Sequence, residues 1–350
     1  MPATPLRIAL IGAGRLGAIH AKLLREISSE RDDVIFAGIY DADPARAAAV
    51  AKDCGVAALA SLGTAAMRCD AAIVATTTST HFTIAAFLLE QKKHLFIEKP
   101  ITATITEADA LIKLEQANGV KIQVGHIERF NPALVAIEAY IHRPRFITAE
   151  RLAGFQLRAT DVSVVHDLMI HDIDLILSLV NSEVVHVSAS GMKVFSDEID
   201  IANARLEFAN GAVANVTASR LSRTKARKMR FFSTDPNTYA SLDFSTGKSE
   251  VFRLLSEPSG RKTKLKEAAA AKILSLFGDI AGQLNGRTID YISPDAPKVN
   301  AMKMEQTSFI DAVRGDTPVK VSSSDGRQAL SVAMQIVERI AEAEAKMNGK

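Results

Sequence analysis

The segment Gly12–Gly17, which reads Gly-Ala-Gly-Arg-Leu-Gly, restricts the possible fold more than any other feature of the sequence. It follows a short apolar run and precedes a stretch with helical periodicity. In that setting Gly12 permits a tight turn, Gly14 lets the backbone approach a bound group, and Gly17 lets helix and strand pack closely. The N–H groups that open such a helix favour a phosphate. The segment therefore predicts a dinucleotide-binding strand–turn–helix unit rather than an ordinary turn.

Strand and helix patterns alternate through the first third of the chain. Leu16, Ile19, Leu23 and Ile27 are expected on one apolar face of the first helix. Thr106 and Asp109 are expected to form a capping box on a later helix that Gly119 ends. Alternation of this kind predicts an α/β Rossmann fold, a doubly wound parallel sheet covered on both faces. The predicted strands are 7–11, 34–40, 70–75, 94–98 and 120–124, and the predicted helices are 16–27, 44–53, 81–91 and 106–118.

The pattern changes after about residue 123. Asn210–Gly211 separates two extended runs as a hairpin turn would, and the last segment, Gly326–Lys350, is predicted to be helical. The charged segment Arg261–Lys272 is expected to form a solvated helix or a connection. We expect residues 1–123 to form an NAD-binding domain and residues 124–350 an α+β substrate-binding and oligomerisation domain with a mostly antiparallel sheet. The other predicted elements are helices 132–140 and 167–180 and strands 145–151, 183–190, 201–208, 212–219, 229–232 and 240–244.

Composition excludes several functional classes. A net charge of +2, 5% aromatic residues and no Trp give no reason to expect a nucleic-acid partner. No stretch approaches the roughly 20 apolar residues of a membrane helix, and the first apolar run is too short for a signal peptide. Cys54 and Cys69 cannot form several disulfides and are expected to be buried thiols in a reducing compartment. We therefore expect a cytoplasmic protein.

Asp41 bears on the choice of cofactor. It stands at the end of the second predicted strand, where a carboxylate can accept hydrogen bonds from both hydroxyls of the adenosine ribose. The same carboxylate repels a 2′-phosphate, whereas Arg15 and Arg46 offset part of that repulsion. The predicted cofactor is therefore NAD, with NADP as the alternative.

Two short motifs carry candidate chemistry. Lys99, in Glu98-Lys99-Pro100, follows a predicted strand, at the edge where doubly wound sheets bind ligands. There it can orient or deprotonate a substrate hydroxyl. Asp167 and His171 lie four residues apart on one face of a predicted helix. When the carbon of an alcohol gives up a hydride, its hydroxyl must lose a proton, and histidine readily accepts that proton. Taken singly, each residue has an ordinary alternative: a solvated lysine, a capping aspartate and a surface or core histidine.

Together these residues carry a family resemblance. The chain resembles the Gfo/Idh/MocA family, the relatives of glucose-fructose oxidoreductase and inositol dehydrogenase. The resemblance covers nearly the whole length, and it also includes Thr76–His81, Gly125–Pro132 and the helix near Asp325-Gly326. The family often has Gly-Gly before the catalytic aspartate, where this chain has Val164–His166. That departure concerns the shape of the substrate pocket rather than the hydride chemistry.

The resemblance implies roles for residues at matching positions. The implied catalytic residues are Lys99, Asp167 and His171, with His171 as the favoured base. Glu98 is implied at the nicotinamide end of the cofactor. The residues expected to bind the cofactor are Gly12, Gly14, Arg15, Leu16, Gly17, Asp41, Thr76, Thr77, His81, Glu98 and Lys99. The residues expected to bind substrate are Lys99, His126, Arg129, Asn131, Asp167 and His171.

No metal is expected, because the neighbouring His166, His171 and Asp172 match no zinc-binding spacing. The resemblance also suggests a homodimer or homotetramer, since one face of a many-stranded sheet would be free to pack against another subunit.

Gly125–Pro132 and Asp167–Asp174 look most like the branch of the family that oxidises UDP-N-acetylglucosamine at its 3-position. The expected function is NAD-dependent oxidation of a sugar secondary hydroxyl to a ketone, on a nucleotide sugar. A dehydrogenase of a free sugar or inositol is one alternative, and a non-catalytic NAD- or sugar-sensing protein is another. The basic stretch Arg220–Arg230 either attracts a diphosphate or forms a solvated strand and loop face.

Overall fold

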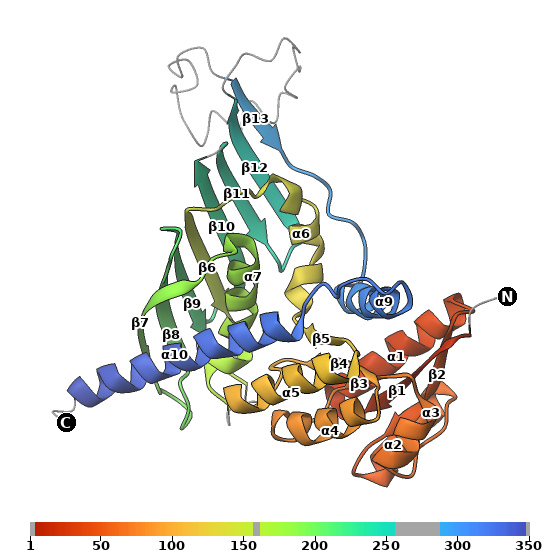
Figure 1. Ribbon diagram of the computed structural model, residues 1–350. Helices are drawn as coiled ribbons and strands as arrows, with labels where there is room; N and C mark the ends of the chain where they lie inside the picture. Colours follow the sequence, from red (N-terminus) through yellow and green to blue (C-terminus); the bar gives the residue numbers. More distant parts are fainter. Residues whose placement is uncertain (1–3, 157–161, 235, 256–287, 348–350) are drawn as a thin grey trace. The chain divides into compact units, whose positions relative to one another are not determined.

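The computed structural model describes residues 4–156, 162–234, 236–255 and 288–347 (Figure 1). The chain divides into two compact units. The first comprises Met1–Phe130 and Val299–Val332, and the second comprises Asn131–Lys298 and Ala333–Lys350. The predicted helix or connection at 261–272 lies outside the described residues. No helix in the described part of the chain is long and apolar enough to cross a membrane.

The first unit contains a five-stranded parallel sheet in the order β2-β1-β3-β4-β5. The order reverses between β1 and β3, which is where open α/β sheets bind ligands at the carboxyl ends of their strands. The predicted Rossmann architecture is thereby confirmed. The strands are β1 (Leu6–Ile11), β2 (Val34–Tyr40), β3 (Ala71–Val74), β4 (His94–Glu98) and β5 (Ile122–Gly125).

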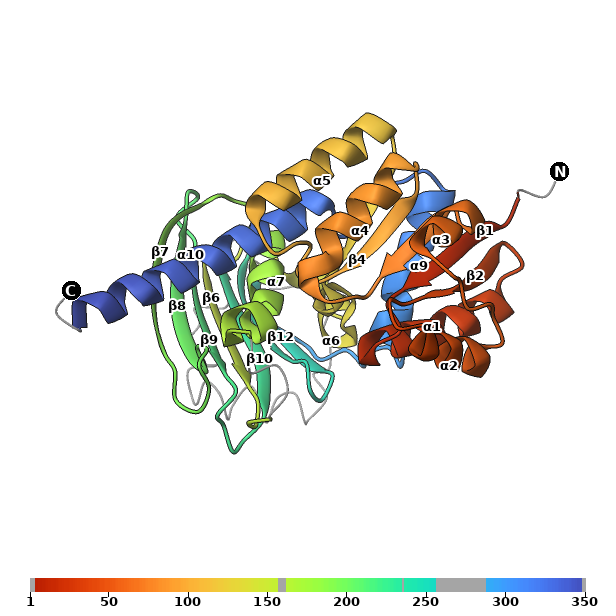
Figure 2. The ribbon, with the colours of Figure 1, turned by 90° about the horizontal axis from the view of Figure 1, so that it is seen from below.

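Helices cover both faces of this sheet (Figure 2). One face packs against α3, α4 and α5, which contribute Ala65, Leu88 and Leu111 to its core. The other packs against α1, α2 and α9, through residues such as Leu24 and Phe309. The helices are α1 (Arg15–Glu30), α2 (Pro44–Cys54), α3 (Leu62–Arg68), α4 (Thr78–Glu90), α5 (Ile105–Asn118), α9 (Ala301–Arg314) and α10 (Ser323–Met347), of which the second unit takes the part after Val332.

Two local predictions in this unit were wrong. The capping box of α5 is formed by Thr104 and Glu107, because Thr106 already lies inside the first turn, and Asp109 instead accepts a hydrogen bond from Arg327 at 2.9 Å. Leu16 and Ile19 in α1 are 37% and 42% exposed. The buried side of that helix is the one that carries Gly17, His20, Ala21, Leu23, Leu24 and Ile27.

Both cysteines are buried free thiols, as predicted. Burial raises the pKa of the Cys69 thiol to about 11, so this sulfur stays protonated and unreactive at neutral pH.

The second unit contains an eight-stranded sheet in the order β13-β12-β11-β10-β6-β9-β8-β7. Its pairings are antiparallel except for β6 with β9, so the predicted mostly antiparallel sheet is confirmed. Gly211, with φ of +79°, turns the predicted hairpin between β8 and β9. The strands are β6 (Phe146–Leu152), β7 (Val184–Met192), β8 (Ile201–Phe208), β9 (Val213–Ser219), β10 (Ala226–Thr234), β11 (Asn237–Asp243), β12 (Lys248–Leu255) and β13 (Thr288–Ile292).

The main helix of the second unit, α7 (Ile170–Val180), lies against β6 and β9. The helix predicted over 167–180 begins earlier, as the π-helical turn η3 (Val165–Met169). Arg151 of β6 fixes α7 to the sheet, because its Nε and Nη2 atoms each donate to a carboxylate oxygen of Asp172 at 2.8 Å. The remaining short helices are η1 (Ile127–Phe130), which the first unit takes, and α6 (Pro132–Val135) and η2 (Glu138–Tyr140).

Candidate active site

The predicted glycine turn joins β1 to α1. Gly12 has φ of +97°, and a Cβ atom there would lie 2.6 Å from the carbonyl oxygen of Ala75. A Cβ atom on Gly17 would lie 2.0 Å from the carbonyl oxygen of Gly12, so this glycine lets helix and turn touch. A Cβ atom on Gly14, by contrast, would lie more than 4 Å from the rest of the described chain beyond its immediate neighbours. Gly12 and Gly17 thus allow close packing within the protein, whereas Gly14 leaves space for a ligand.

That space is part of a cavity of about 460 Å³ in the first unit. It lies at the carboxyl ends of β1, β2 and β3, and a volume of this size suits a cofactor fragment. No side chain caps the first turn of α1, which leaves its positive end to a ligand. The lining residues are Ile11, Gly12, Gly14, Arg15, Leu16, Tyr40, Asp41, Ala42, Arg46, Leu62, Ala75, Thr76, Thr77, Thr80 and Ile84.

Asp41 holds a defined place in this cavity. Its Oδ2 atom accepts a hydrogen bond from the Ala13 backbone N–H at 2.6 Å, and its Oδ1 atom accepts one from the Asp43 N–H at 2.8 Å. Arg46 lies 3.7 Å from Oδ1. Each carboxylate oxygen has a second lone pair, so the group retains acceptor capacity for ribose hydroxyls. The arrangement fits an adenosine ribose at the end of β2.

Glu98 lies at the carboxyl end of β4 and is held by buried neighbours. Its Oε1 atom lies 2.6 Å from Nε2 of His20, and its Oε2 atom accepts the Lys99 backbone N–H at 3.1 Å. Nδ1 of His20 lies 2.8 Å from the amide nitrogen of Gln306, so the buried imidazole connects Glu98 to Gln306. Burial is the largest single influence and would raise the pKa of Glu98, but the hydrogen bonds and charges of His20 and Lys99 together outweigh it, so that this pKa is lowered. Glu98 is therefore a fixed carboxylate that positions the backbone of Lys99.

His81 connects two strand ends. Its Nδ1 atom lies 2.9 Å from the carbonyl oxygen of Pro100, and its Nε2 atom lies 3.2 Å from that of Thr76. The ring is 1% exposed, and burial lowers the pKa of His81. A neutral imidazole can donate to only one of these carbonyls at a time. The residue holds the loop after β3 against the loop after β4.

Three further candidates lie near these strand ends in the first unit. Lys99 is half-buried after β4, and His126 is buried directly after β5, the strand beside β4. Arg129 lies in η1, is 8% exposed, and its Nη2 atom lies 3.7 Å from Asp325. A Cβ atom on Gly125 would lie 3.0 Å from Oε2 of Glu98, so this glycine makes room for the carboxylate.

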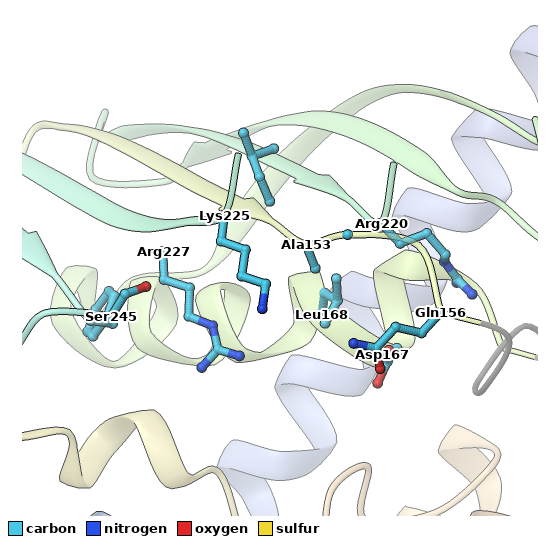
Figure 3. A pocket seen from close by; sticks show the side chains of 11 residues that line it. Ala153, Gln156, Asp167, Leu168, Arg220, Lys225, Arg227 and Ser245 are labelled. Carbon is cyan, nitrogen blue, oxygen red and sulfur yellow. The ribbon is translucent and has the colours of Figure 1, made fainter. Parts of the chain in front are cut away.

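The second unit contains a cavity of its own, also of about 460 Å³. Asp167 and Leu168 from η3 form one wall, and residues that follow β6, β9 and β11 or begin β10 form the others (Figure 3). The predicted catalytic carboxylate therefore lies in a cavity that also holds three cationic side chains. The lining residues are Leu152, Ala153, Gly154, Gln156, Asp167, Leu168, Arg220, Lys225, Arg227, Phe244 and Ser245.

The segment that carries Asp167 has an unusual local structure. Val164 and Val165 are fully buried, and the π-helical turn begins at Val165. π-Helical turns are frequent at functional sites. His171 is half-buried in the first turn of α7, four residues beyond Asp167. Asn131 caps α6, because its side chain accepts a hydrogen bond from the Ala133 N–H at 3.1 Å.

The predicted residues thus form two groups, one in each unit. The glycine turn, Asp41, Thr76 and Thr77 surround the first cavity, with His81, Glu98 and Lys99 at neighbouring strand ends, whereas Asp167 lies at the second cavity. Sequence reasoning missed His20 and Gln306. The only signal for His20 was a polar residue on the packed side of a helix, and Gln306 lies in a helix that was not predicted. Among the described residues, no group of three or more His, Cys, Asp or Glu side chains is arranged to hold a metal.

Comparison with known proteins places this geometry in context. Residues 6–126 match an oxidoreductase family with an NAD-binding Rossmann fold, and residues 133–235 match the GFO/IDH/MocA C-terminal domain. The chain is 34% identical to UDP-N-acetylglucosamine 3-dehydrogenase of Acidithiobacillus ferrooxidans, over 95% of this chain and 96% of that protein. It is 30% identical to scyllo-inositol 2-dehydrogenase (NAD(+)) of Bacillus subtilis, over 62% of this chain and 68% of that one.

Solved structures agree with these matches. A structure of the Acidithiobacillus ferrooxidans UDP-N-acetylglucosamine 3-dehydrogenase has a TM-score of 0.81 at 33% identity, and the likeness covers 96% of this chain and 97% of that one. Levoglucosan dehydrogenase in complex with NADH and levoglucosan has a TM-score of 0.79 at 20% identity, with 97% of this chain and 98% of that one covered. The second likeness is one of fold alone.

Proposed function

The chain belongs to the GFO/IDH/MocA family of NAD-dependent oxidoreductases, and on that premise we propose that it oxidises a secondary hydroxyl of a nucleotide sugar to a ketone. UDP-N-acetylglucosamine, oxidised at its 3-position, is the proposed substrate. One observation carries the choice of substrate. The likeness to UDP-N-acetylglucosamine 3-dehydrogenase extends over 95% of the chain, whereas that to scyllo-inositol 2-dehydrogenase extends over 62%.

The proposal assigns cofactor binding to residues 1–123 and substrate binding to residues 124–350. When bound, NAD accepts the hydride that leaves the substrate carbon. Three features of the first cavity support NAD: the open space at Gly14, the uncapped start of α1, and Asp41 at the end of β2. The Asp41 carboxylate favours a free ribose 2′-hydroxyl over a 2′-phosphate. The proposed cofactor-binding residues are those expected from the sequence.

The proton of the substrate hydroxyl requires a separate acceptor. We assign this step to His171, with Asp167 and Lys99 as the other catalytic residues. Lys99 would hold the reacting oxygen, and the buried Glu98 would keep its backbone in place through the hydrogen bond of 3.1 Å. His126, Arg129 and Asn131 complete the proposed set of substrate-binding residues.

The wider setting of the protein follows from the same proposal. We infer a cytoplasmic enzyme with a small-molecule substrate and with no nucleic-acid or membrane partner. We also infer a homodimer or homotetramer. The exposed face of the eight-stranded sheet supports this inference, because it carries exposed aromatic side chains such as Phe146 and Phe232, at 40% and 39%.

Mass spectrometry tests the proposed function. Purified protein is incubated with NAD and UDP-N-acetylglucosamine, and in parallel with free N-acetylglucosamine or scyllo-inositol. The proposal predicts that, of the three compounds, only the nucleotide sugar gives a product that lacks two hydrogens. The His171→Ala variant should give no such product. Oxidation of scyllo-inositol but not of the nucleotide sugar would instead support an inositol dehydrogenase. NAD binding without turnover of any of the three would support a sensor.

A further inference from the structure

The three cations of the second cavity differ in what they already contact. Arg220 is 6% exposed, and its Nη2 atom donates to the carbonyl oxygens of Val162 and Ile199. Its Nε atom lies 3.5 Å from Asp200, which is fully buried. A guanidinium that is enclosed and paired in this way holds the fold together. It has little capacity left for a ligand.

Lys225 and Arg227 are different. Both are exposed at the cavity, and within the described residues neither has a carboxylate within 4.0 Å. Figure 3 shows the two side chains extending into the cavity, with Asp167 beyond Leu168. Among the described residues, the cavity thus has a cationic part, whose two charges no carboxylate neutralises, and a separate part with a carboxylate. An anionic group is favoured at the first and disfavoured at the second.

The register of β10 separates Arg227 from the next two cations along the strand, Lys228 and Arg230. Arg227 pairs with Arg151, whose side chain contacts α7, so the side chain of Arg227 is on the helix-covered face of the sheet. Successive side chains of a strand point to opposite faces. Lys228 is the next residue after Arg227, so its side chain points to the opposite face, and Arg230, two residues further, points to the same face as Lys228. Their partners on β6 are Glu150 and Thr148. That face is the one away from α7.

We propose that Lys225 and Arg227 form a phosphate subsite that binds the diphosphate of the substrate, while Asp167 lies toward the sugar. This inference rests on the proposed function and makes it more specific, since it divides one cavity between a nucleoside diphosphate and a reacting sugar. Two flexible cations suit a diphosphate, whose two phosphates each offer acceptors for charge-assisted hydrogen bonds. Neither a free inositol nor an uncharged sugar would use them.

The test compares Lys225→Gln and Arg227→Gln with Lys228→Gln and Arg230→Gln, which remove the same charge from the face of β10 opposite to Arg227. Calorimetry measures the affinity for UDP and for uridine, and steady-state assays measure KM and kcat for UDP-N-acetylglucosamine. We expect each cavity variant to weaken UDP binding and raise KM by about ten-fold, as loss of one charged hydrogen bond would. Uridine affinity, NAD affinity and both control variants should stay within about two-fold of wild type.

Two results would overturn the inference. In the first, the cavity variants and the control variants change UDP affinity equally, which would indicate only a general charge effect. In the second, UDP affinity and KM are unchanged in Lys225→Gln and Arg227→Gln although the wild type oxidises UDP-N-acetylglucosamine. That second result would leave the proposed function standing and remove the subsite alone. The proposed function itself fails when the wild type leaves UDP-N-acetylglucosamine unoxidised.

Discussion

The buried pair of Arg151 and Asp172 offers the sharpest test of how the second unit holds its helix. The two side chains are 4% and 3% exposed and form two parallel hydrogen bonds of 2.8 Å. Asp172→Asn would keep the shape of the side chain and remove its charge, so that the guanidinium of Arg151 stays buried without its carboxylate. Removing one partner of a buried ion pair costs about 3–5 kcal/mol.

That cost converts into a large thermal shift. In a domain of 150–250 residues, each kcal/mol lowers Tm by roughly 2–4 °C, so a loss of about 3–5 kcal/mol predicts a fall of roughly 6–20 °C. Circular dichroism during thermal unfolding measures it. The matched control is Arg205→Gln, whose partner Glu207 is exposed and whose pair is 44% and 42% exposed. Such a surface pair contributes about 0–1 kcal/mol. A fall in Tm for Asp172→Asn no larger than that of the control would refute the reasoning.

Three further predictions concern the cofactor turn and one buried carboxylate. Asp41→Ala should weaken NAD binding and reduce the preference for NAD over NADP, and a wild type that prefers NADP in calorimetry would contradict the assignment. Gly17→Ala should destabilise the fold, because its Cβ would lie 2.0 Å from the Gly12 carbonyl oxygen, whereas Gly14→Ala should fold normally and lose NAD affinity; equal Tm values for both would be inconsistent with this. Asp200 is buried, which opposes ionisation, but hydroxyl and backbone hydrogen bonds lower its pKa to about 2, below the ordinary 3.8. Its stabilising contribution is therefore present above about pH 4 and lost as the pH falls toward 2, and Asp200→Asn should show less acid destabilisation over that window in denaturant titrations.

Much of the fold follows from local patterns in the sequence. The first unit alternates buried strands with capped helices, and Asp43 caps α2 by accepting hydrogen bonds from two N–H groups at its start. The helix predicted over 326–350 is present as α10, and Ala329, Ala333, Ile336 and Ile340 form a buried stripe on it. Such periodicity predicts these elements correctly because each of them buries one face against a sheet, and the apolar residues of that face recur at a regular spacing.

The elements that were missed lacked such a pattern. Strand β10 was predicted only over 229–232, because charged residues follow one another at its start, yet it extends over Ala226–Thr234. The length of β10 depends on its pairing with the neighbouring strands β6 and β11, and the sequence of β10 alone does not reveal that pairing. Helix α9 has a polar composition, and its buried Gln306 reaches His20 across 286 residues of sequence.

The candidate site shows the same division. The glycine turn and Asp41 were recognisable because each position needs a property that few residue types have: the absence of a Cβ atom in the turn and a carboxylate at the end of β2. The separation of Arg220 from Lys225 and Arg227 was not recognisable, since the three cations are equivalent until Asp200 is placed beside one of them. Five of the six cations in the basic stretch therefore divide in the structure into one paired arginine, two cavity cations and two side chains on the opposite face.

Hydride transfer from the proposed carbon is the measurement that tests the central claim most directly. UDP-N-acetylglucosamine carrying deuterium at C3 is incubated with the protein and NAD, and both the nucleotide sugar and the reduced cofactor are analysed by mass spectrometry. The account predicts that the sugar loses its deuterium as the 3-ketone forms and that the label appears on the nicotinamide. Retention of the deuterium on the sugar, with NAD unchanged or reduced without label, would contradict it.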